Sequence, residues 1–173
     1  MRVVRTSSAV LSVALVATRA HRAIQHAPDT HTPARLFFDG VCNLCDGFVN
    51  FVADHDAQRI IQFAAQQKHQ DELERLKAPT DLSTLVLVQG DHVYLYSSAA
   101  IRTFALLDWP YRALAVALVV PAPVRDLAYR LVAKYRYVVF GKTDSCRVPT
   151  GDFKRRFIDC QPDDDDPITA GGE

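Results

Sequence analysis

The sequence predicts an α/β domain with a mixed sheet, and three observations lead to this fold class. Short apolar runs alternate with segments of helical periodicity through the first half of the chain. Two β-rich runs then flank Gly90-Asp91, a turn signal that predicts an antiparallel hairpin. The segments that follow the hairpin have the 3.6-residue period of helices.

The first predicted element is a buried strand, RLFFD, over Arg35 to Asp39. A helix follows from Asn43, and its apolar stripe consists of Leu44, Phe48, Phe51, Val52 and His55. A second strand is predicted over Arg59 to Ala64, and a polar helix over Gln66 to Leu76. Because the first two strands flank a helix, we expect them to pair in parallel.

The second half begins with the hairpin, predicted over Ser83 to Tyr96. Ser97 is the expected N-cap of the next helix. A further helix should start at Trp109-Pro110, because proline is favoured at the first helical position. Its run ALAVALVV is too short for a membrane span, which takes about 20 residues, and predicts a core helix.

The last predicted helix, after Pro123, has the clearest amphipathic pattern in the chain. Its apolar stripe consists of Val124, Leu127, Ala128, Leu131, Val132 and Tyr135. The opposite face carries Arg125, Asp126, Arg130 and Lys134. The order strand, helix, strand, helix, hairpin, helix is that of a thioredoxin-type or glutaredoxin-type fold, here with additional C-terminal helices.

We expect three regions: an N-terminal segment 1–34, a folded domain 35–150 and a C-terminal extension 151–173 with a solvated acidic tail. The first is rich in Ala, Val, Ser and Arg, with a net charge of +3, which is typical of an organellar transit peptide. A mitochondrion is favoured over a plastid. A secretory signal, or a cytoplasmic protein with an unstructured start, are the alternatives.

Composition excludes some classes of function. The formal net charge is zero, and no cluster of Lys and Arg indicates a nucleic-acid surface. No segment is long and apolar enough to be a transmembrane helix. Four cysteines in 173 residues are too few for the disulfide framework of a small secreted domain. Their spacing suits catalysis or metal binding better.

Cys42 and Cys45 form a Cys-x-x-Cys pair where the first strand passes into the first helix. Unpaired N–H groups and the helix dipole at a helix start stabilise a thiolate, the form that attacks disulfides. Cys45 lies one turn on, within reach of a disulfide with Cys42. Asp39, at the strand end, either accepts a proton or tunes the pair, or only forms a turn with Gly40.

Two other interpretations of the cysteines stay open. They could be structural, because a free cysteine packs as a small hydrophobe. They could be half of a zinc site, but this needs a second closely spaced ligand pair. Cys146 and Cys160 are separated by thirteen residues, and His55 lies on an apolar stripe, where it is expected to be a core or boundary residue.

The run DGVCNLCDGFVNFV resembles the signature of the DCC family of thiol-disulfide oxidoreductases, named for its Asp-x-x-Cys-x-x-Cys motif. Asp39, Cys42 and Cys45 occupy those three positions. Later blocks, among them LVLVQGDHVYLYSSAAIR and VVPAPVRDLAYRLVAKYRYVVFGKTDSCRVPT, extend the resemblance over about residues 35–150. It implies a thioredoxin-like fold and disulfide reduction or exchange by the dithiol. The substrate would carry a disulfide, an external dithiol would supply electrons, and no bound cofactor is required.

The chain departs from a thioredoxin at two positions. Val41 replaces the tryptophan before the first cysteine, and Ser83-Thr84 stand where the cis-proline that grips substrate is expected. Cys146, in GKTDSCRVPT, is either a third redox cysteine or a turn residue. Arg136, Lys142 and Arg147 could form a basic rim, but a solvated face is the expectation. The competing function is a redox-inactive module that docks a partner through its last helix.

Overall fold

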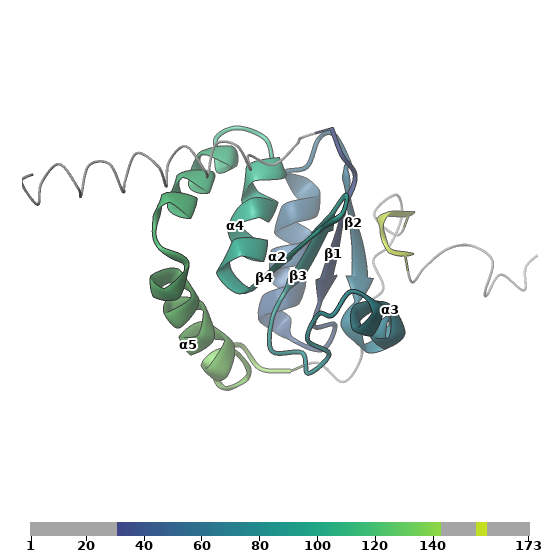
Figure 1. Ribbon diagram of the computed structural model, residues 1–173, viewed down its shortest axis with the longest axis vertical. Helices are drawn as coiled ribbons and strands as arrows, with labels where there is room; N and C mark the ends of the chain where they lie inside the picture. Colours follow the sequence, from purple (N-terminus) through teal and green to yellow (C-terminus); the bar gives the residue numbers. More distant parts are fainter. Residues whose placement is uncertain (1–30, 143–154, 159–173) are drawn as a thin grey trace, which may run out of the picture.

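A four-stranded mixed sheet lies at the centre of the fold (Figure 1). The computed structural model describes residues 31–142 and 155–158 of the chain. The sheet has the order β2-β1-β3-β4, with strands β1 (Ala34–Phe38), β2 (Ile61–Ala65), β3 (Val86–Gln89) and β4 (His92–Leu95). β1 pairs in parallel with β2 and antiparallel with β3. The predicted α/β class, with its thioredoxin-like order of elements, is confirmed.

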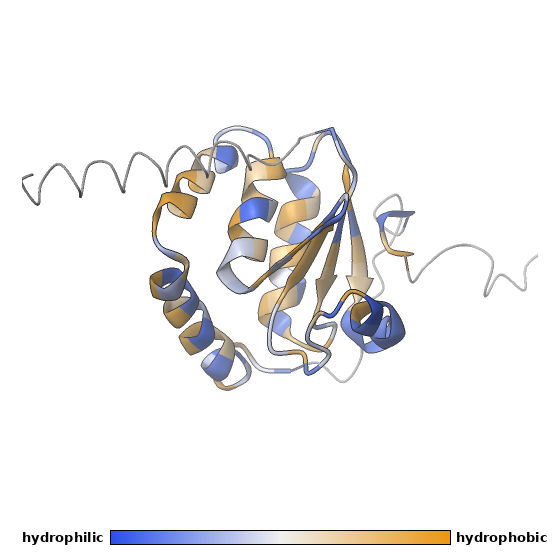
Figure 2. Ribbon diagram, viewed as in Figure 1, coloured by the Kyte–Doolittle hydropathy of each residue, from blue (hydrophilic) through white to orange (hydrophobic). Residues whose placement is uncertain are grey.

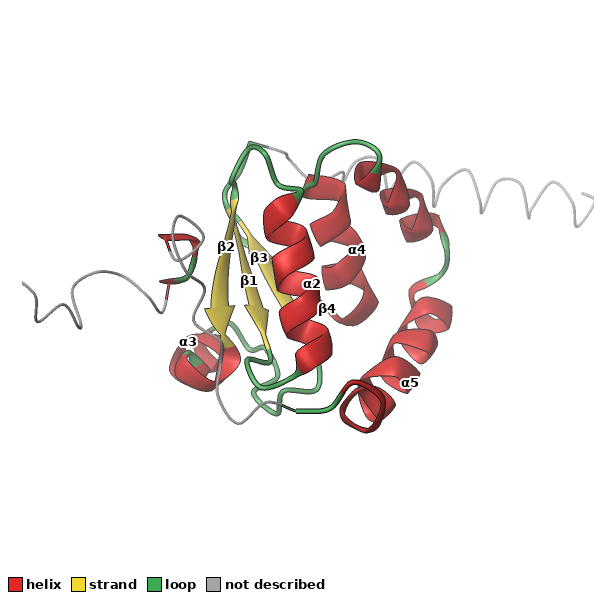
Figure 3. Ribbon diagram, turned by 180° about the vertical axis from the view of Figure 1, so that it is seen from behind, coloured by secondary structure: helices red, strands yellow, loops and turns green. Residues whose placement is uncertain are grey.

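Alternation along the strands produces a core on each face of the sheet. Phe37 lies opposite Ala64 and Val86 in the register, and all three pack with Leu73 on one face. On the other face lie Leu36, Phe38, Ile61, Phe63 and Leu87. Each fully buried side chain of this kind contributes about 1.5–3 kcal/mol to folding. Figure 3 shows α2 and α4 covering this second face, with α3 on the opposite side.

Helix α2 (Asn43–Asp54) uses the predicted stripe to cover the sheet. Val49 and Val52 are fully buried, and Phe48 and Phe51 pack beside them. His55, just after the helix, is half-buried, with its ring 4.4 Å from that of Phe51. The prediction of a boundary histidine there is confirmed.

The polar helix predicted over Gln66 to Leu76 is two shorter elements, η1 (Gln66–Lys68) and α3 (Gln70–Arg75). The break is at His69, whose backbone is not helical (φ −121°, ψ 33°). The Gln66 amide is buried and donates hydrogen bonds to the carbonyl oxygens of Phe37 and Thr84, which ties this turn to the sheet.

The prediction that Ser97 caps the next helix is wrong. Helix α4 (Tyr96–Leu106) begins one residue earlier, and its first amides are satisfied by distant side chains. The Tyr96 amide donates to Thr84 Oγ1 at 2.7 Å, and the Ser97 amide donates to Asp126 Oδ1 at 3.3 Å. Side chains from the loop before β3 and from α5 therefore take the place of a local cap.

The prediction of a core helix after Trp109-Pro110 is also wrong. The segment is a 3₁₀ helix, η2 (Tyr111–Val119), and it has no buried residue. It is bounded by prolines at Pro110 and Pro121, and it connects α4 to α5 along the outside of the domain (Figure 1).

Helix α5 (Ala122–Phe140) is amphipathic as predicted, but its apolar stripe faces outward (Figure 2). Leu127 is 72% exposed and Leu131 is 59% exposed. Arg125 and Asp126, from the polar side, make contacts with the domain instead, whereas Arg130 and Lys134 are exposed. Arg125 donates hydrogen bonds to the hydroxyls of Ser97 and Ser98, and Asp126 accepts from Ser97. Within the part of the chain described, no helix combines the length and apolarity that crossing a bilayer requires.

Residues 155–158 cover the outer edge of β2. Phe157 forms a parallel bridge with Phe63 and is almost fully buried. Arg156 forms an ion pair with the buried carboxylate of Asp56 and donates to the carbonyl oxygen of Ile61. This short segment, more than 90 residues beyond β2, thus belongs to the core.

Candidate functional site

Cys42 lies between β1 and the first turn of α2. Asp39 follows β1 and builds the connecting turn: its carboxylate accepts from the Val41 amide, and its carbonyl accepts from the Cys42 amide at 3.2 Å. Cys42 has extended backbone angles, and its carbonyl oxygen accepts the first helical hydrogen bond, from Asp46, at 2.9 Å. Cys42 is therefore the N-cap residue of α2, where helix amides favour an anion.

Cys45 lies one turn later, and the two cysteines differ in their surroundings. Both are free thiols; Cys42 is 1% exposed, whereas Cys45 is partly exposed and lines a pocket. Burial raises the pKa of Cys45, and its hydrogen bond and charge interaction with Cys42 and the charge of Asp39 raise it further. Arg136 acts in the opposite direction. Cys45 thus stays a protonated thiol at neutral pH.

Asp39 is 2% exposed and accepts four hydrogen bonds. Oδ1 accepts from the Val41 amide and from Gln67 Nε2 at 2.8 Å. Oδ2 accepts from Arg136 Nη2 at 3.2 Å and from the Tyr137 hydroxyl. Asp39 therefore forms a turn and also links β1, η1 and α5 beside the cysteines.

Arg136 does not belong to a solvated rim, and that expectation is wrong. It is 8% exposed and pairs with Asp39 because the polar side of α5 faces the domain. Nη2 also donates to the Leu82 carbonyl oxygen at 2.8 Å, and Nη1 donates to that of Ala133 at 2.9 Å. Nε is buried and has no hydrogen-bond partner within the described structure.

Tyr137 extends the same cluster. Burial and the hydrogen bond to Asp39 raise its pKa to about 12. Its ring lies between two cations, with the Arg136 guanidinium carbon 4.3 Å and Lys142 Nζ 4.1 Å from the centroid. Favourable cation–π contacts of this kind hold the end of α5 in place.

The C-terminal end of α5 meets the start of α2. Lys142 forms an antiparallel backbone bridge with Cys42, and Asn43 Nδ2 donates to the carbonyl oxygen of Phe140 at 2.9 Å. Gly141 connects them with φ +77°, a conformation that favours glycine. A β-carbon there would also lie 3.3 Å from Asn43 Nδ2. This contact brings Arg136 and Tyr137 to the cysteines.

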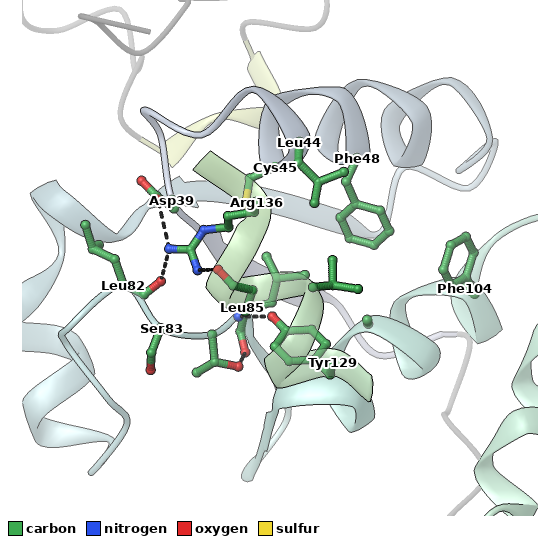
Figure 4. A pocket seen from close by; sticks show the side chains of 14 residues that line it. Asp39, Leu44, Cys45, Phe48, Leu82, Ser83, Leu85, Phe104, Tyr129 and Arg136 are labelled. Atoms are coloured by element: carbon green, nitrogen blue, oxygen red, sulfur yellow. Dashed lines mark hydrogen bonds and ion pairs between the residues drawn. The ribbon is translucent and has the colours of Figure 1, made fainter. Parts of the chain in front are cut away.

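A pocket of about 240 Å³ opens beside Cys45 (Figure 4). Its polar end contains Asp39 and Arg136, and its walls come from α2, α4, α5 and the loop before β3. That loop includes Ser83 and Thr84, at the position where a cis-proline was expected for a thioredoxin. Leu82, in the same loop, has φ +61°, a strained conformation of the sort that gathers at functional sites.

The structure brings Asp39, Cys42 and Cys45 together. Cys146, Cys160 and Arg147 lie outside the described residues, so a redox role of Cys146 stays a prediction. Among residues 31–142 and 155–158, no three His, Cys, Asp or Glu side chains converge as a metal site would require. Tyr137 and Gln67 were not identified from the sequence. For Tyr137 the available signal was the block YRLVAKYRYVVFGK, which carries part of the family resemblance.

Comparisons with known proteins identify relatives of this chain. Residues 36–142 match the family model described as DCC1-like thiol-disulfide oxidoreductase. The chain is 40% identical over 126 residues to the uncharacterized protein YuxK of Bacillus subtilis, covering 71% of this chain and 92% of the relative. It is 44% identical over 117 residues to the chloroplastic DCC family protein At1g52590 of Arabidopsis thaliana, covering 65% of this chain and 68% of the relative. No solved structure matches significantly.

Proposed function

The chain belongs to the DCC1-like thiol-disulfide oxidoreductase family, and from this premise we propose that it reduces protein disulfides with the Cys42–Cys45 pair. The observation that carries the proposal is the placement of Cys42 at the start of α2, with Cys45 one turn later beside a pocket. Disulfide exchange needs a thiolate and a second thiol within reach, and this arrangement supports both.

The reaction has two steps. The Cys42 thiolate attacks one sulfur of the substrate disulfide, that S–S bond breaks, and the departing substrate sulfur takes a proton. Cys45 then loses its proton and attacks the Cys42 sulfur of the mixed disulfide. This releases the second substrate thiol and leaves a Cys42–Cys45 disulfide. An external dithiol reductant returns the pair to its reduced form.

The pKa of Cys45 supports this assignment of roles. Burial raises it, so Cys45 is a poor nucleophile at neutral pH and suits the resolving step. Cys42 is left as the attacking residue. Asp39 contributes its charge, which keeps Cys45 protonated, and we assign it as the acceptor of the Cys45 proton in the second step.

Cys42 is buried, so a substrate sulfur needs part of its cover to move. The backbone bridge between Cys42 and Lys142, at the end of α5, lies at this point. The bridge is isolated and Gly141 precedes Lys142, so its opening would leave the four-stranded sheet intact.

Trapping and alkylation test the proposal. The Cys45→Ser variant should accumulate a mixed disulfide with a disulfide-containing substrate, whereas Cys42→Ser should not. Iodoacetamide should alkylate Cys42 in preference to Cys45, because the helix amides favour an anion at Cys42. Preferential alkylation of Cys45, together with no trapped mixed disulfide, would overturn the proposed function.

The reduction potential of the pair would set the direction of electron flow. A value near that of thioredoxin, roughly −270 mV, fits the proposed reductase; a value near −120 mV fits an oxidant instead.

We further propose that residues 1–34 direct the chain to an organelle. The chloroplastic relative from Arabidopsis supports a plastid, whereas the composition of the segment favours a mitochondrion. Mass spectrometry of the protein from isolated plastids and mitochondria would show which organelle contains it and where its mature N-terminus lies.

One observation favours a second candidate, a redox-inactive module that docks a partner. It is the outward apolar stripe of α5, which the redox chemistry does not use. Under this alternative, Cys42→Ser leaves function intact and changes at Arg130 or Lys134 abolish it. The reductase predicts the reverse for Cys42→Ser.

A further inference from the structure

The pocket beside Cys45 has a polar end and an apolar body. Asp39, Cys45 and Arg136 form the polar end. The body is lined by large apolar side chains from three helices and one strand end, chiefly Leu44, Phe48, Leu85, Phe104 and Val132. Figure 4 shows Leu44, Phe48 and Phe104 on one side of this space and Leu85 with Tyr129 on the other.

The volume and the polar end restrict what fits. About 240 Å³ is smaller than the roughly 300–1,000 Å³ of sites for drug-sized ligands, so the pocket suits one bulky side chain. Arg136 is paired with Asp39, so the polar end does not call for a charged ligand. Buried Arg136 Nε still offers one unused donor, which a neutral carbonyl oxygen could satisfy.

We propose that this pocket selects substrates: it holds a large apolar side chain next to the substrate cysteine, while Arg136 Nε donates to a nearby peptide carbonyl. The inference rests on the proposed function, because a substrate sulfur bonded to Cys42 lies one helical turn from Cys45, which lines this cavity. The substrate class is therefore a peptide disulfide with a bulky aliphatic or aromatic neighbour. A small polar neighbour would leave the apolar walls without contacts.

Two probe peptides with one intramolecular disulfide test the selection. They are identical except that the residue after one cysteine is Leu in the first and Ser in the second. With dithiothreitol as the reductant and its direct reaction subtracted, kcat/KM for the Leu peptide should be higher by on the order of tenfold, since burying a Leu side chain is worth at least that factor.

A matched pair of variants connects the preference to the pocket. Val132 lines the pocket and is 54% exposed, so Val132→Glu should fold and should lower kcat/KM for the Leu peptide about tenfold, with little change for the Ser peptide. Ala128→Glu, on the exposed surface one turn earlier in α5, should keep the preference. Circular dichroism checks that both variants are folded.

The possible outcomes distinguish a failure of the pocket inference from a failure of the proposed function. Equal rates for both peptides, or an equal loss for both in Val132→Glu, overturn the pocket inference and leave the reductase in place. Reduction of neither peptide overturns the proposed function and this inference with it.

A separate observation concerns the outer surface of η2 and α5 (Figure 2). Every exposed large hydrophobic side chain of the described residues lies between Trp109 and Phe140. Val138 is the most exposed of them, at 83%. Monomeric soluble proteins rarely expose so extended an apolar surface without a binding partner.

The charge of this surface identifies the partner. Residues 109–142 contain six cations and one acid, but Arg136 is buried and Arg125 and Asp126 bind the start of α4, so four exposed cations remain on this surface. Arg112, Arg130, Lys134 and Lys142 are exposed beside the apolar side chains. A second copy of this chain would bring the same positive charge against it. An amphipathic surface with a tryptophan and flanking cations is instead typical of segments that lie in an anionic lipid interface.

We infer that the η2–α5 surface docks the protein onto anionic membranes from one side. The full chain should co-sediment with vesicles of phosphatidylcholine mixed with phosphatidylglycerol at low salt, and bind vesicles of phosphatidylcholine alone at least tenfold more weakly, since several cations take part. Two variants should each lose most of this binding: Leu127→Asn with Val138→Asn, and Arg130→Gln with Lys134→Gln.

The charge-matched control is Lys68→Gln with Lys77→Gln, which removes two exposed cations outside this surface and should keep the binding. Equal binding by this control and by both surface variants would overturn the inference, as would equal binding to both vesicle types. Sedimentation equilibrium supplies the remaining outcome: a stable dimer without vesicle binding means that a second copy covers the surface.

Discussion

The guanidinium of Arg136 and the carboxylate of Asp39 form a buried ion pair between residues 97 positions apart, with Nη2 and Oδ2 separated by 3.2 Å. The pair lies directly beside Cys45 and connects α5 to the end of β1. Its geometry makes α5 part of the candidate site, although both cysteines lie at the start of α2.

Removing Arg136 should therefore cost stability. Arg136→Met leaves the Asp39 charge buried without its partner, and breaking a buried pair in this way costs about 3–5 kcal/mol. The free energy of unfolding in urea measures the loss. Arg130→Met is the control in the same helix: Arg130 is exposed and stacks on Tyr96, a contact worth at most about 1 kcal/mol. Similar losses in both variants would contradict the role given to the ion pair.

The charge of Asp39 should be detectable at Cys45. Because that charge raises the pKa of Cys45, Asp39→Asn should lower it. The measurement is the pH dependence of Cys45 alkylation by iodoacetamide, comparing Cys42→Ser with and without Asp39→Asn. The midpoint should move to lower pH in the double variant. Asp54→Asn, at the far end of α2, should leave it unchanged, and a shift to higher pH would refute the electrostatic argument.

The raised pKa of Tyr137 predicts that the folded state loses stability at alkaline pH. Its folded pKa of about 12 lies above the value of about 10 for an ordinary tyrosine. The folded state therefore holds a proton that the unfolded chain releases first, so stability is present below pH 10 and falls as pH rises towards 12. Thermal unfolding should show a smaller alkaline loss for Tyr137→Phe than for the parent. Tyr135→Phe, an exposed neighbour in α5, should behave like the parent.

The outward stripe of α5 makes a prediction about packing. Leu127→Gln changes an exposed side chain and should alter the free energy of unfolding by less than about 0.5 kcal/mol. Leu106→Ala removes a side chain that is 1% exposed and should cost about 2–5 kcal/mol. Denaturant titration of the two variants compares their free energies of unfolding. A cost above 2 kcal/mol at Leu127 would mean that the stripe is buried.

Local signals in the sequence were enough for the sheet and for α2. The run RLFFD, the Gly90 turn and the spacing of Phe48, Phe51 and Val52 indicated these elements, and the structure has β1, the start of α2 and the hairpin within three residues of their predicted bounds. Cys42 could be placed at a helix start for the same reason. Its chemistry depends on backbone amides that immediately follow it in the chain.

The wrong predictions for Ser97, η2 and α5 have a common cause. Each depends on which surfaces pack together in the folded domain. A hydrophobic period indicates that α5 has two faces, but it does not say that Asp126 and Arg125 will bind the start of α4. That contact turns the polar face inward, buries Arg136 and leaves the leucines outside. Ser97 failed as a cap for the same reason, because Thr84 and Asp126 supply acceptors from 12 and 29 residues away.

The segment at residues 155–158 has a consequence for self-association. β2 is an edge strand, and Phe157 bridges to it while Arg156 neutralises buried Asp56. A chain cut after Lys142, where the family match ends, would lose both residues. The uncovered strand edge would then template the addition of strands from other molecules, because an unpaired edge is a site of aggregation. We therefore expect a short piece of chain outside the region that matches the family to protect this protein from forming polymers.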